Sequence, residues 1–142
     1  MKEIDWEALT FHYTETDYIV RCACHDGIWD RPYATQDKYI RIHAAATGLH
    51  YGQECFEGLK AFRGKDGKVR VFRIDENQKR LEHTCDGIVM PKLPEGMFRE
   101  AIIRVVKENL RFVPPYESGA SLYIRPVLFG YTPQIGVNPA KA

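Results

Sequence analysis

The sequence predicts an α+β domain with a largely antiparallel sheet, and three observations support this fold class. Short segments with the alternating pattern of strands come first, two segments with helical spacing follow, and another strand-like segment comes after them. The chain has 142 residues, which is enough for a single hydrophobic core. Its composition, with 44% hydrophobic and 27% charged residues, is that of an ordinary globular domain and excludes wholesale disorder or a collagen-like repeat.

The first part of the chain predicts two short strands. Residues 18–25 (Y-I-V-R-C-A-C-H) alternate as a strand does, and Asp26 with Gly27 predicts a turn after them. Residues 39–43 alternate again and predict a second short strand, whereas the small residues at 44–48 predict a link.

A hairpin is predicted in the middle of the chain. Two strand-like segments, 55–62 and 68–74, flank residues 63–67, which contain two glycines and an Asp-Gly pair. Such a connection between two apolar segments is typical of a β-hairpin.

Two helices are predicted next. Asp75 is the predicted N-cap of the first, because its carboxylate can accept hydrogen bonds from the free amides of a first turn, and this helix reaches about Ile88. Prolines at 91 and 94 then break the pattern. Apolar residues recur three and four apart from Met97 to Leu110, which predicts an amphipathic helix.

The last strand-like segment, 121–128, contains a candidate carboxylate site. Its Pro126 indicates an edge strand or a bulge. Tyr123 and Arg125 are two residues apart, so a strand places the phenol beside the guanidinium, and together they suit a carboxylate. The alternative is an exposed arginine on an edge strand that packs along an aromatic ring.

Arg80 is a candidate phosphate ligand. It lies near the start of the first predicted helix, where amides and a guanidinium can hold a phosphate together. The alternative is a solvated helix face, because Glu76 and Lys79 allow ordinary ion pairing at helical spacing. The sequence contains no G-x-G-x-x-G, G-x-x-x-x-G-K-[S/T] or H-E-x-x-H motif that would favour a nucleotide or zinc enzyme.

Charge and cysteine content limit the partners that we expect. Twenty Lys and Arg against nineteen Asp and Glu give a net charge of +1, so neither nucleic acid nor a membrane is an expected partner. We expect a cytoplasmic protein with four reduced cysteines, because an apolar signal core is absent after Met1. We expect no metal, because the spacing of Cys22 and Cys24 is not that of a zinc knuckle.

Four stretches of the sequence resemble the branched-chain amino acid aminotransferases, which are pyridoxal 5'-phosphate enzymes of fold type IV. They follow one another in the family's order and cover most of residues 11–137. The stretches are L-H-Y-G-Q-E-C-F-E-G-L-K-A-F-R-G at 49–64, F-R-I-D-E-N-Q-K-R-L at 72–81, V-P-P-Y-E-S-G-A-S-L-Y-I-R-P at 113–126 and G-Y-T-P-Q-I-G-V at 130–137.

The resemblance assigns roles to individual residues. It implies that Arg80 holds the cofactor phosphate and that Tyr123 and Arg125 surround the substrate carboxylate. The remaining positions implied to bind substrate are aromatic walls of the side-chain pocket and a loop that reaches across the family's dimer, with Tyr51 also presented to the neighbouring subunit: Phe11, Tyr51, Phe56, Ile135 and Val137.

The resemblance also implies a reaction and a division of the enzyme into domains. The expected reaction transfers the amino group of leucine, isoleucine or valine to 2-oxoglutarate in a homodimer, with pyridoxal 5'-phosphate as cofactor. The family's Schiff-base lysine lies in its second domain, and none of the lysines here, Lys60 and Lys65 included, matches it. We therefore expect residues 1–142 to be the small N-terminal domain and to be inactive alone.

Two other readings remain open on the sequence. One is another fold-type IV enzyme, such as a D-amino acid aminotransferase or an aminodeoxychorismate lyase, although these would not share both the 50–58 and the 122–126 stretches. The other is a stand-alone binding or dimerisation module. An exposed apolar patch where a second domain belongs would count against such a module.

Overall fold

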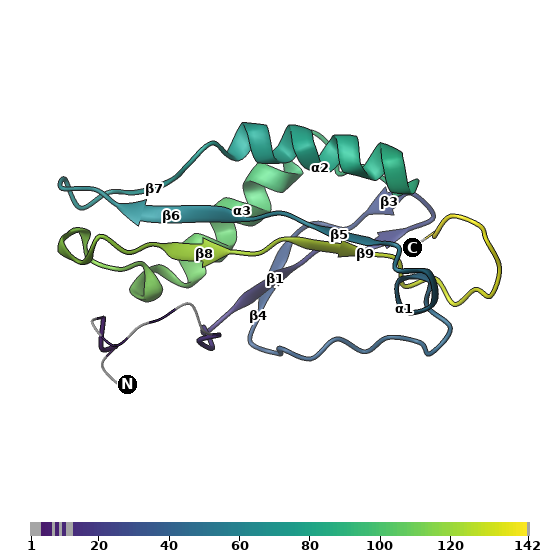
Figure 1. Ribbon diagram of the computed structural model, residues 1–142, viewed down its shortest axis with the longest axis horizontal. Coiled ribbons are helices and arrows are strands. Elements are labelled where there is room, and N and C mark those ends of the chain that lie inside the picture. The colour runs from purple at the N-terminus through teal and green to yellow at the C-terminus, as the bar shows by residue number, and fades with distance from the viewer. Residues whose placement is uncertain (1–3, 7, 9, 11–12, 142) are drawn as a thin grey trace.

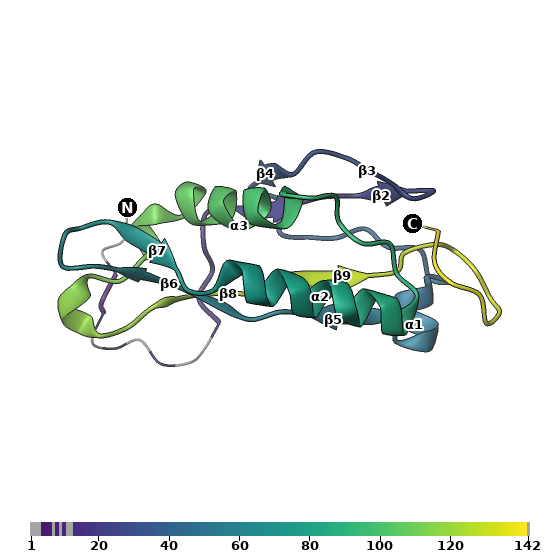
Figure 2. The same ribbon diagram turned by 90° about the horizontal axis from the view of Figure 1, so that it is seen from above.

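The centre of the molecule is a long antiparallel ribbon with helices on one side (Figures 1 and 2). The computed structural model describes residues 4–6, 8, 10 and 13–141. Four strands form the ribbon: β5 (Glu54–Phe56), β6 (Leu59–Arg63), β8 (Leu122–Ile124) and β9 (Val127–Phe129). Strand β5 pairs with β9 and β6 pairs with β8, both antiparallel. The predicted α+β class with antiparallel sheets is confirmed.

Both long segments of the ribbon are interrupted, and the two interruptions lie opposite each other. The first segment breaks at Glu57 and Gly58, and the second breaks at Arg125 and Pro126. A backbone hydrogen bond joins the breaks, from the amide of Glu57 to the carbonyl of Pro126 at 2.9 Å. Proline has no amide hydrogen and cannot continue a ladder, so the predicted effect of Pro126 is confirmed. Strand β8 is accordingly an edge strand of its sheet.

The predicted hairpin is confirmed. Strand β6 pairs with β7 (Val69–Val71), with Ala61 opposite Val71. The connection is closed by a hydrogen bond of 2.9 Å from the amide of Gly64 to the carbonyl of Lys68. Gly67 has a φ of 74°, which a residue without a Cβ adopts at little cost.

Two helices cover one side of the ribbon. They are α2 (Ile74–Ile88) and α3 (Met97–Glu108), close to the predicted bounds. Helix α3 contacts both α2 and the β1–β4 pair (Figure 2). The core between helices and ribbon is formed by Leu59, Ala61, Ile74, Leu81, Cys85, Met90, Phe98, Ile102, Val106, Val113, Ile124 and Ala140.

The prediction that Asp75 caps the first helix is wrong. Helix α2 begins at Ile74, so its N-cap is Arg73, two residues before Asp75, with a left-handed backbone with φ of 50° and no side-chain cap. The tight passage from β7 into the helix leaves no extended residue at position 75. The carboxylate of Asp75 instead lies in the first turn, where it suits the helix dipole and pairs with Arg99.

The N-terminal third forms two small antiparallel pairs. Strand β1 (Ile19–Arg21) pairs with β4 (Tyr33–Thr35), and β2 (Cys24–His25) pairs with β3 (Ile28–Trp29). The predicted strand 18–25 is therefore two strands, and the predicted turn at residues 26–27 joins the second to β3.

The predicted strand at residues 39–43 is wrong. These residues form no regular element, and Tyr39 is 87% exposed. The carbonyls of Asp37 and Tyr39 accept hydrogen bonds from the guanidinium of Arg21 rather than from a neighbouring strand. The predicted link at 44–48 is partly helical, because α1 (Thr47–Tyr51) begins inside it.

The chain after β9 has no helix or strand through residue 141, and it returns to α1. The amide of Gly130 donates to the carbonyl of Gln53, and Ala46 forms an isolated bridge with Pro133. Two 3-10 turns, at Leu110–Phe112 and Tyr116–Ser118, connect α3 with β8. Among the described residues, no helix combines the length and apolar character that a membrane span requires.

Candidate active site

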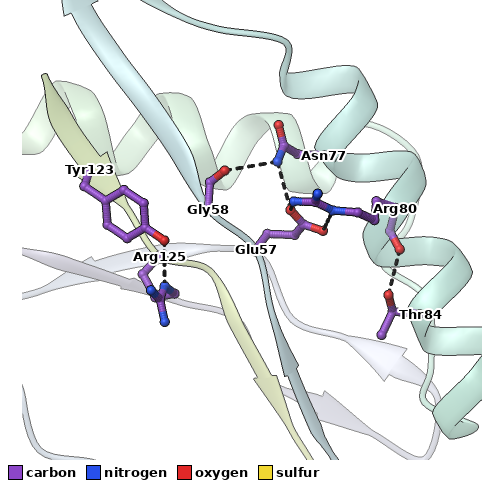
Figure 3. A network of polar contacts seen from close by, with 7 residues as sticks. All are labelled: Glu57, Gly58, Asn77, Arg80, Thr84, Tyr123 and Arg125. Atoms are coloured by element: carbon purple, nitrogen blue, oxygen red, sulfur yellow. Dashed lines mark hydrogen bonds and ion pairs between the residues drawn. The ribbon is translucent and has the colours of Figure 1, made fainter.

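Two arginines lie on opposite sides of the break in the ribbon. Phe56 and Glu57 are neighbours at the end of β5, and their side chains separate: Phe56 is 61% exposed, whereas Glu57 is 2% exposed. Figure 3 shows Tyr123 and Arg125 on one side of this strand and Arg80 with Glu57 on the other. The break therefore organises two separate groups of polar side chains.

On the helix side, a buried carboxylate holds Arg80 in a bidentate ion pair. Arg80 donates from Nε to Oε1 of Glu57 at 2.7 Å and from Nη2 to Oε2 at 2.5 Å. Asn77 donates from Nδ2 to Oε2 of Glu57 at 2.8 Å and to the carbonyl of Gly58 at 3.1 Å. Four polar groups from the strand break and a helix thus form one connected network (Figure 3).

The helical spacing of α2 produces this arrangement. Asn77 and Arg80 are three residues apart, so their side chains lie on one face of the helix, above the β5–β6 junction. Leu81 and Cys85 on the adjoining face enter the core and fix the helix against the ribbon. Asn77 and Arg80 therefore reach Glu57 from a helix that core packing has already placed.

The network keeps the carboxylate of Glu57 charged. Burial raises the pKa of this carboxyl, but hydrogen bonds from Arg80 and Asn77 and the charge of Arg80 lower it more, so the pKa lies below its ordinary value. The hydrogen bonds and charge of Glu57 in turn raise the pKa of Arg80. At neutral pH the pair is fully ionised.

Arg80 retains donors for a further anion. Its Nε and one N–H of Nη2 serve Glu57, and among the described residues no atom accepts a hydrogen bond from Nη1. The Arg80 side chain is 66% exposed, so the remaining N–H groups face solvent. A guanidinium has five N–H donors in a fixed plane, and those left over fit a phosphate group. The first-turn amides of Glu76 and Asn77 already donate to the carbonyl of Arg73, so these two amides are not available to an anion.

On the open side, Arg125 lies against two aromatic rings. Its Nε donates to the phenol oxygen of Tyr123 at 3.1 Å. Its Cζ is 4.2 Å from the ring centroid of Phe56 and 5.2 Å from that of Tyr123. Tyr123 and Arg125 thus lie side by side, as the strand spacing predicts, while their binding roles stay predictions.

Arg125 faces an open hollow. The hollow has a volume of about 400 Å³ and is lined by Glu54, Cys55, Phe56, Arg125 and Val127. Within the part of the chain that the structure describes, no carboxylate lies within ion-pair distance of Arg125. A planar cation beside a half-apolar hollow suits a small carboxylate that carries an apolar side chain.

Gly58 allows the tyrosine to approach the strand. A Cβ at this position would lie 2.6 Å from the phenol oxygen of Tyr123, too close for a real contact. The phenol therefore rests on the backbone of Gly58, whose carbonyl also accepts from Asn77. One glycine in this way contacts both groups of polar residues.

The remaining predicted substrate residues gather at the α1 end of the ribbon. The hydroxyl of Tyr51 accepts a hydrogen bond of 2.7 Å from the amide of Gly136. The residues flanking that amide, Ile135 and Val137, are exposed, Val137 to 96%. The structure thus brings Tyr51, Ile135 and Val137 together, whereas Phe11 lies outside the described residues.

Sequence reasoning assigned no role to Glu57 or Asn77. The available signal was a carboxylate inside an otherwise apolar strand segment, C-F-E-G-L, together with Asn77 three residues before Arg80. Charged residues in such segments are rarely buried unless they are paired, so this signal could have indicated a cationic partner for Glu57.

Comparisons with known proteins show what the chain is similar to. No protein-family profile matches the chain. The chain is 46% identical over 140 residues to the branched-chain-amino-acid aminotransferase of Haemophilus influenzae and 40% identical over 141 residues to that of Helicobacter pylori. Each match covers 99% of this chain, which spans about two fifths of the length of these relatives, 41% and 42%.

Solved structures agree with the sequence comparison. The branched-chain amino acid aminotransferase from Escherichia coli matches with a TM-score of 0.66 and 26% identity, over 88% of this chain and 37% of that one. The enzyme of T.th., solved in complex with N-(5'-phosphopyridoxyl)-L-glutamate, matches with a TM-score of 0.60 and 27% identity, over 89% of this chain and 37% of that one. By sequence and by fold, the chain is similar to part of the branched-chain amino acid aminotransferases, as its motifs predict.

Proposed function

We propose that the whole protein is a branched-chain amino acid aminotransferase that transfers the amino group of leucine, isoleucine or valine to 2-oxoglutarate. The observation that carries this proposal is the pair of arginines at one break of the ribbon, one with free donors on the helix side and one stacked on aromatic rings on the open side. The named relatives act as aminotransferases, which fits two anion-binding arginines at one site.

Arg80 is the proposed ligand of the phosphate of pyridoxal 5'-phosphate. Its solvent-facing N–H groups match phosphate oxygens. When bound, the cofactor supplies an electron sink for the amino acid's α-carbon. We propose that the lysine attached to the cofactor belongs to a second domain outside these residues, and that residues 1–142 form the small N-terminal domain.

Arg125 and Tyr123 are the proposed ligands of a substrate carboxylate. The guanidinium presents a planar pair of donors, and the phenol that accepts from its Nε can donate its own hydrogen to the same carboxylate. Phe56, which is stacked on Arg125, forms one apolar wall of the hollow. Phe11 is proposed as a further wall. Such walls select leucine, isoleucine and valine by buried area and shape.

A homodimer is the proposed assembly. Tyr51, Ile135 and Val137 expose apolar surface at one end of the ribbon, and the hydrogen bond from Gly136 to Tyr51 holds them in one patch. In such a dimer, Tyr51 and the loop with Ile135 and Val137 of one copy would lie beside the hollow of the other copy. Sedimentation of the full-length protein should give a dimer, and a Val137→Asp variant should shift the equilibrium toward monomer. The cytoplasmic location stays a prediction.

The proposed activity is tested with the full-length protein. Leucine, isoleucine or valine is supplied with 2-oxoglutarate and pyridoxal 5'-phosphate, and glutamate formation is measured. We expect turnover with all three amino acids and none by the 142-residue chain alone. Turnover of D-alanine without turnover of the branched-chain amino acids would replace this proposal with a D-amino acid aminotransferase. Absence of turnover together with specific binding of a partner protein would replace it with a binding module.

A further inference from the structure

Arg80 makes its two bonds to Glu57 with one edge of the guanidinium. The Nε and Nη2 atoms lie on that edge, and Nη1 lies on the other. A bidentate pair of this kind fixes the plane of the guanidinium as well as its position. The N–H groups that remain therefore point in a defined direction before any anion arrives.

Glu57 is itself held firmly. It is almost fully buried, its amide donates to the carbonyl of Pro126, and its Oε2 accepts from Asn77. Asn77 belongs to the same helix as Arg80 and also donates to the carbonyl of Gly58. The backbone of one strand break and the side chain of one asparagine thus fix the carboxylate that fixes the arginine.

The geometry points to Glu57 and Asn77 as positioning residues that orient Arg80 toward the phosphate of the cofactor. This inference rests on the proposed function, in which Arg80 binds that phosphate. A flexible exposed arginine would lose side-chain entropy on binding a phosphate, and an arginine already held in plane loses less. Neither Glu57 nor Asn77 needs to touch the cofactor for this effect.

Charge alone predicts the opposite result. The carboxylate of Glu57 neutralises Arg80 and repels a phosphate dianion, so its removal should strengthen phosphate binding if attraction were the main contribution. Orientation predicts that its removal weakens phosphate binding. The sign of the change therefore separates the two accounts.

The test uses the full-length apoenzyme and two probes, pyridoxal 5'-phosphate and pyridoxal, which lacks the phosphate. The dissociation constant of each is measured by absorbance titration, and the constant for pyridoxal divided by that for pyridoxal 5'-phosphate gives a ratio that reports the phosphate contribution alone. We expect Glu57→Gln to lower this ratio by about tenfold, within the range for residues that orient a ligand through a second residue. Asn77→Ala should lower it less, because Glu57 keeps its bonds to Arg80.

Matched controls separate orientation from charge and from general damage. Glu76→Gln removes an exposed carboxylate four residues before Arg80 that pairs with Lys79 instead, and the ratio should stay the same. A loss of fold in Glu57→Gln would weaken pyridoxal and pyridoxal 5'-phosphate alike, and Asn77→Ala then carries the test. In an Arg80→Ala background, Glu57→Gln should cause no further change.

The outcomes distinguish this inference from the function on which it rests. If Arg80→Ala leaves the ratio intact, the assignment of the phosphate to Arg80 is wrong. If Arg80→Ala removes the phosphate preference while Glu57→Gln and Asn77→Ala keep or increase it, the assignment stands and the positioning role is overturned.

Discussion

Each side of the β5–β6 break holds one arginine, and the contacts that hold it differ between the two sides. On the helix side, Arg80 is held by the buried carboxylate of Glu57, which fixes its plane and neutralises its charge. On the open side, Arg125 is held by the rings of Phe56 and Tyr123 and by one phenol oxygen, which leave its charge in place.

This difference matches two kinds of ligand. A cofactor phosphate stays in its site through many turnovers, so a donor fixed in one orientation suits it. A substrate carboxylate must enter and leave in every cycle, so an uncompensated charge at an open hollow suits it. The same strand can serve both because consecutive side chains, Phe56 and Glu57, point to opposite faces.

The largest expected effect is on the open side. In the full-length enzyme, Arg125→Ala should lower kcat/KM for the amino acid by at least about 100-fold, because a charge-assisted carboxylate contact is lost. The dissociation constant of the cofactor should change less than about twofold, since Arg80 is intact. Steady-state kinetics and cofactor titration measure the two effects. Arg31→Ala, at an exposed position between β3 and β4, serves as the control. Equal losses in substrate use and cofactor affinity would contradict the division between the two sides.

The next effect compares two neighbouring residues for stability. Glu57→Ala should lower the free energy of unfolding by about 2–3 kcal/mol, because charge-assisted hydrogen bonds are lost and a buried space is left. Phe56→Ala should lower it by less than about 1 kcal/mol, because that ring is mostly exposed. Urea unfolding of both variants, monitored by circular dichroism, measures the difference. Similar losses at the two positions would mean that another part of the protein buries the ring of Phe56.

A smaller effect is the pH dependence of the helix-side network. The pKa of Glu57 lies below its ordinary 4.5 in the folded protein, so the ion pair stabilises the fold above that pH and loses its contribution as pH falls through the lowered pKa. The stability difference between wild type and Glu57→Gln should therefore be constant near neutral pH and shrink below about pH 4.5. Urea unfolding between about pH 3 and pH 7 tests this sign. A difference that grows toward low pH would show that burial, not pairing, dominates at Glu57.

A substitution at Gly58 disturbs the open side through a single added Cβ atom. Gly58→Ala should raise KM for the amino acid by about tenfold, because the new Cβ pushes the phenol of Tyr123 away from Arg125. Gly87→Ala is the matched control: nothing lies within 4 Å of its new Cβ, and alanine in α2 should stabilise the helix by about 0.5–1 kcal/mol. An unchanged KM in Gly58→Ala would mean that Tyr123 and Arg125 stay together without this close approach.

Local patterns predicted much of the fold. The hairpin at residues 63–67 and both long helices follow from turn residues and apolar spacing, because these signals act over a few residues. The strand expected at 39–43 fails because alternation needs a neighbouring strand, and here Arg21 takes the carbonyls of Asp37 and Tyr39 instead. The partner that decides such a segment is distant in sequence.

The candidate site was only partly predictable for the same reason. Spacing alone places Tyr123 beside Arg125, because strand geometry is local. The bond between Glu57 and Arg80 joins a strand break to a helix residue 23 positions later, and no local pattern specifies that contact. The helix-start pattern and the family motifs both indicated Arg80, whereas its pairing with the buried carboxylate of Glu57 is seen only in the fold.

The smallest effect tests how much the phenol adds to Arg125. Tyr123→Phe keeps the ring that lies beside the guanidinium but removes the oxygen that accepts from Nε. We expect kcat/KM for the amino acid to fall by about threefold to tenfold, the cost of one hydrogen bond, with cofactor affinity unchanged. The double variant Tyr123→Phe/Arg125→Ala should be worse than Arg125→Ala by no more than this same factor, because the phenol keeps its own contact with the carboxylate when the guanidinium is removed. If Tyr123→Phe instead costs as much as Arg125→Ala and alters the pH dependence of kcat, the hydroxyl takes part in proton transfer, and the open side does more than hold a carboxylate.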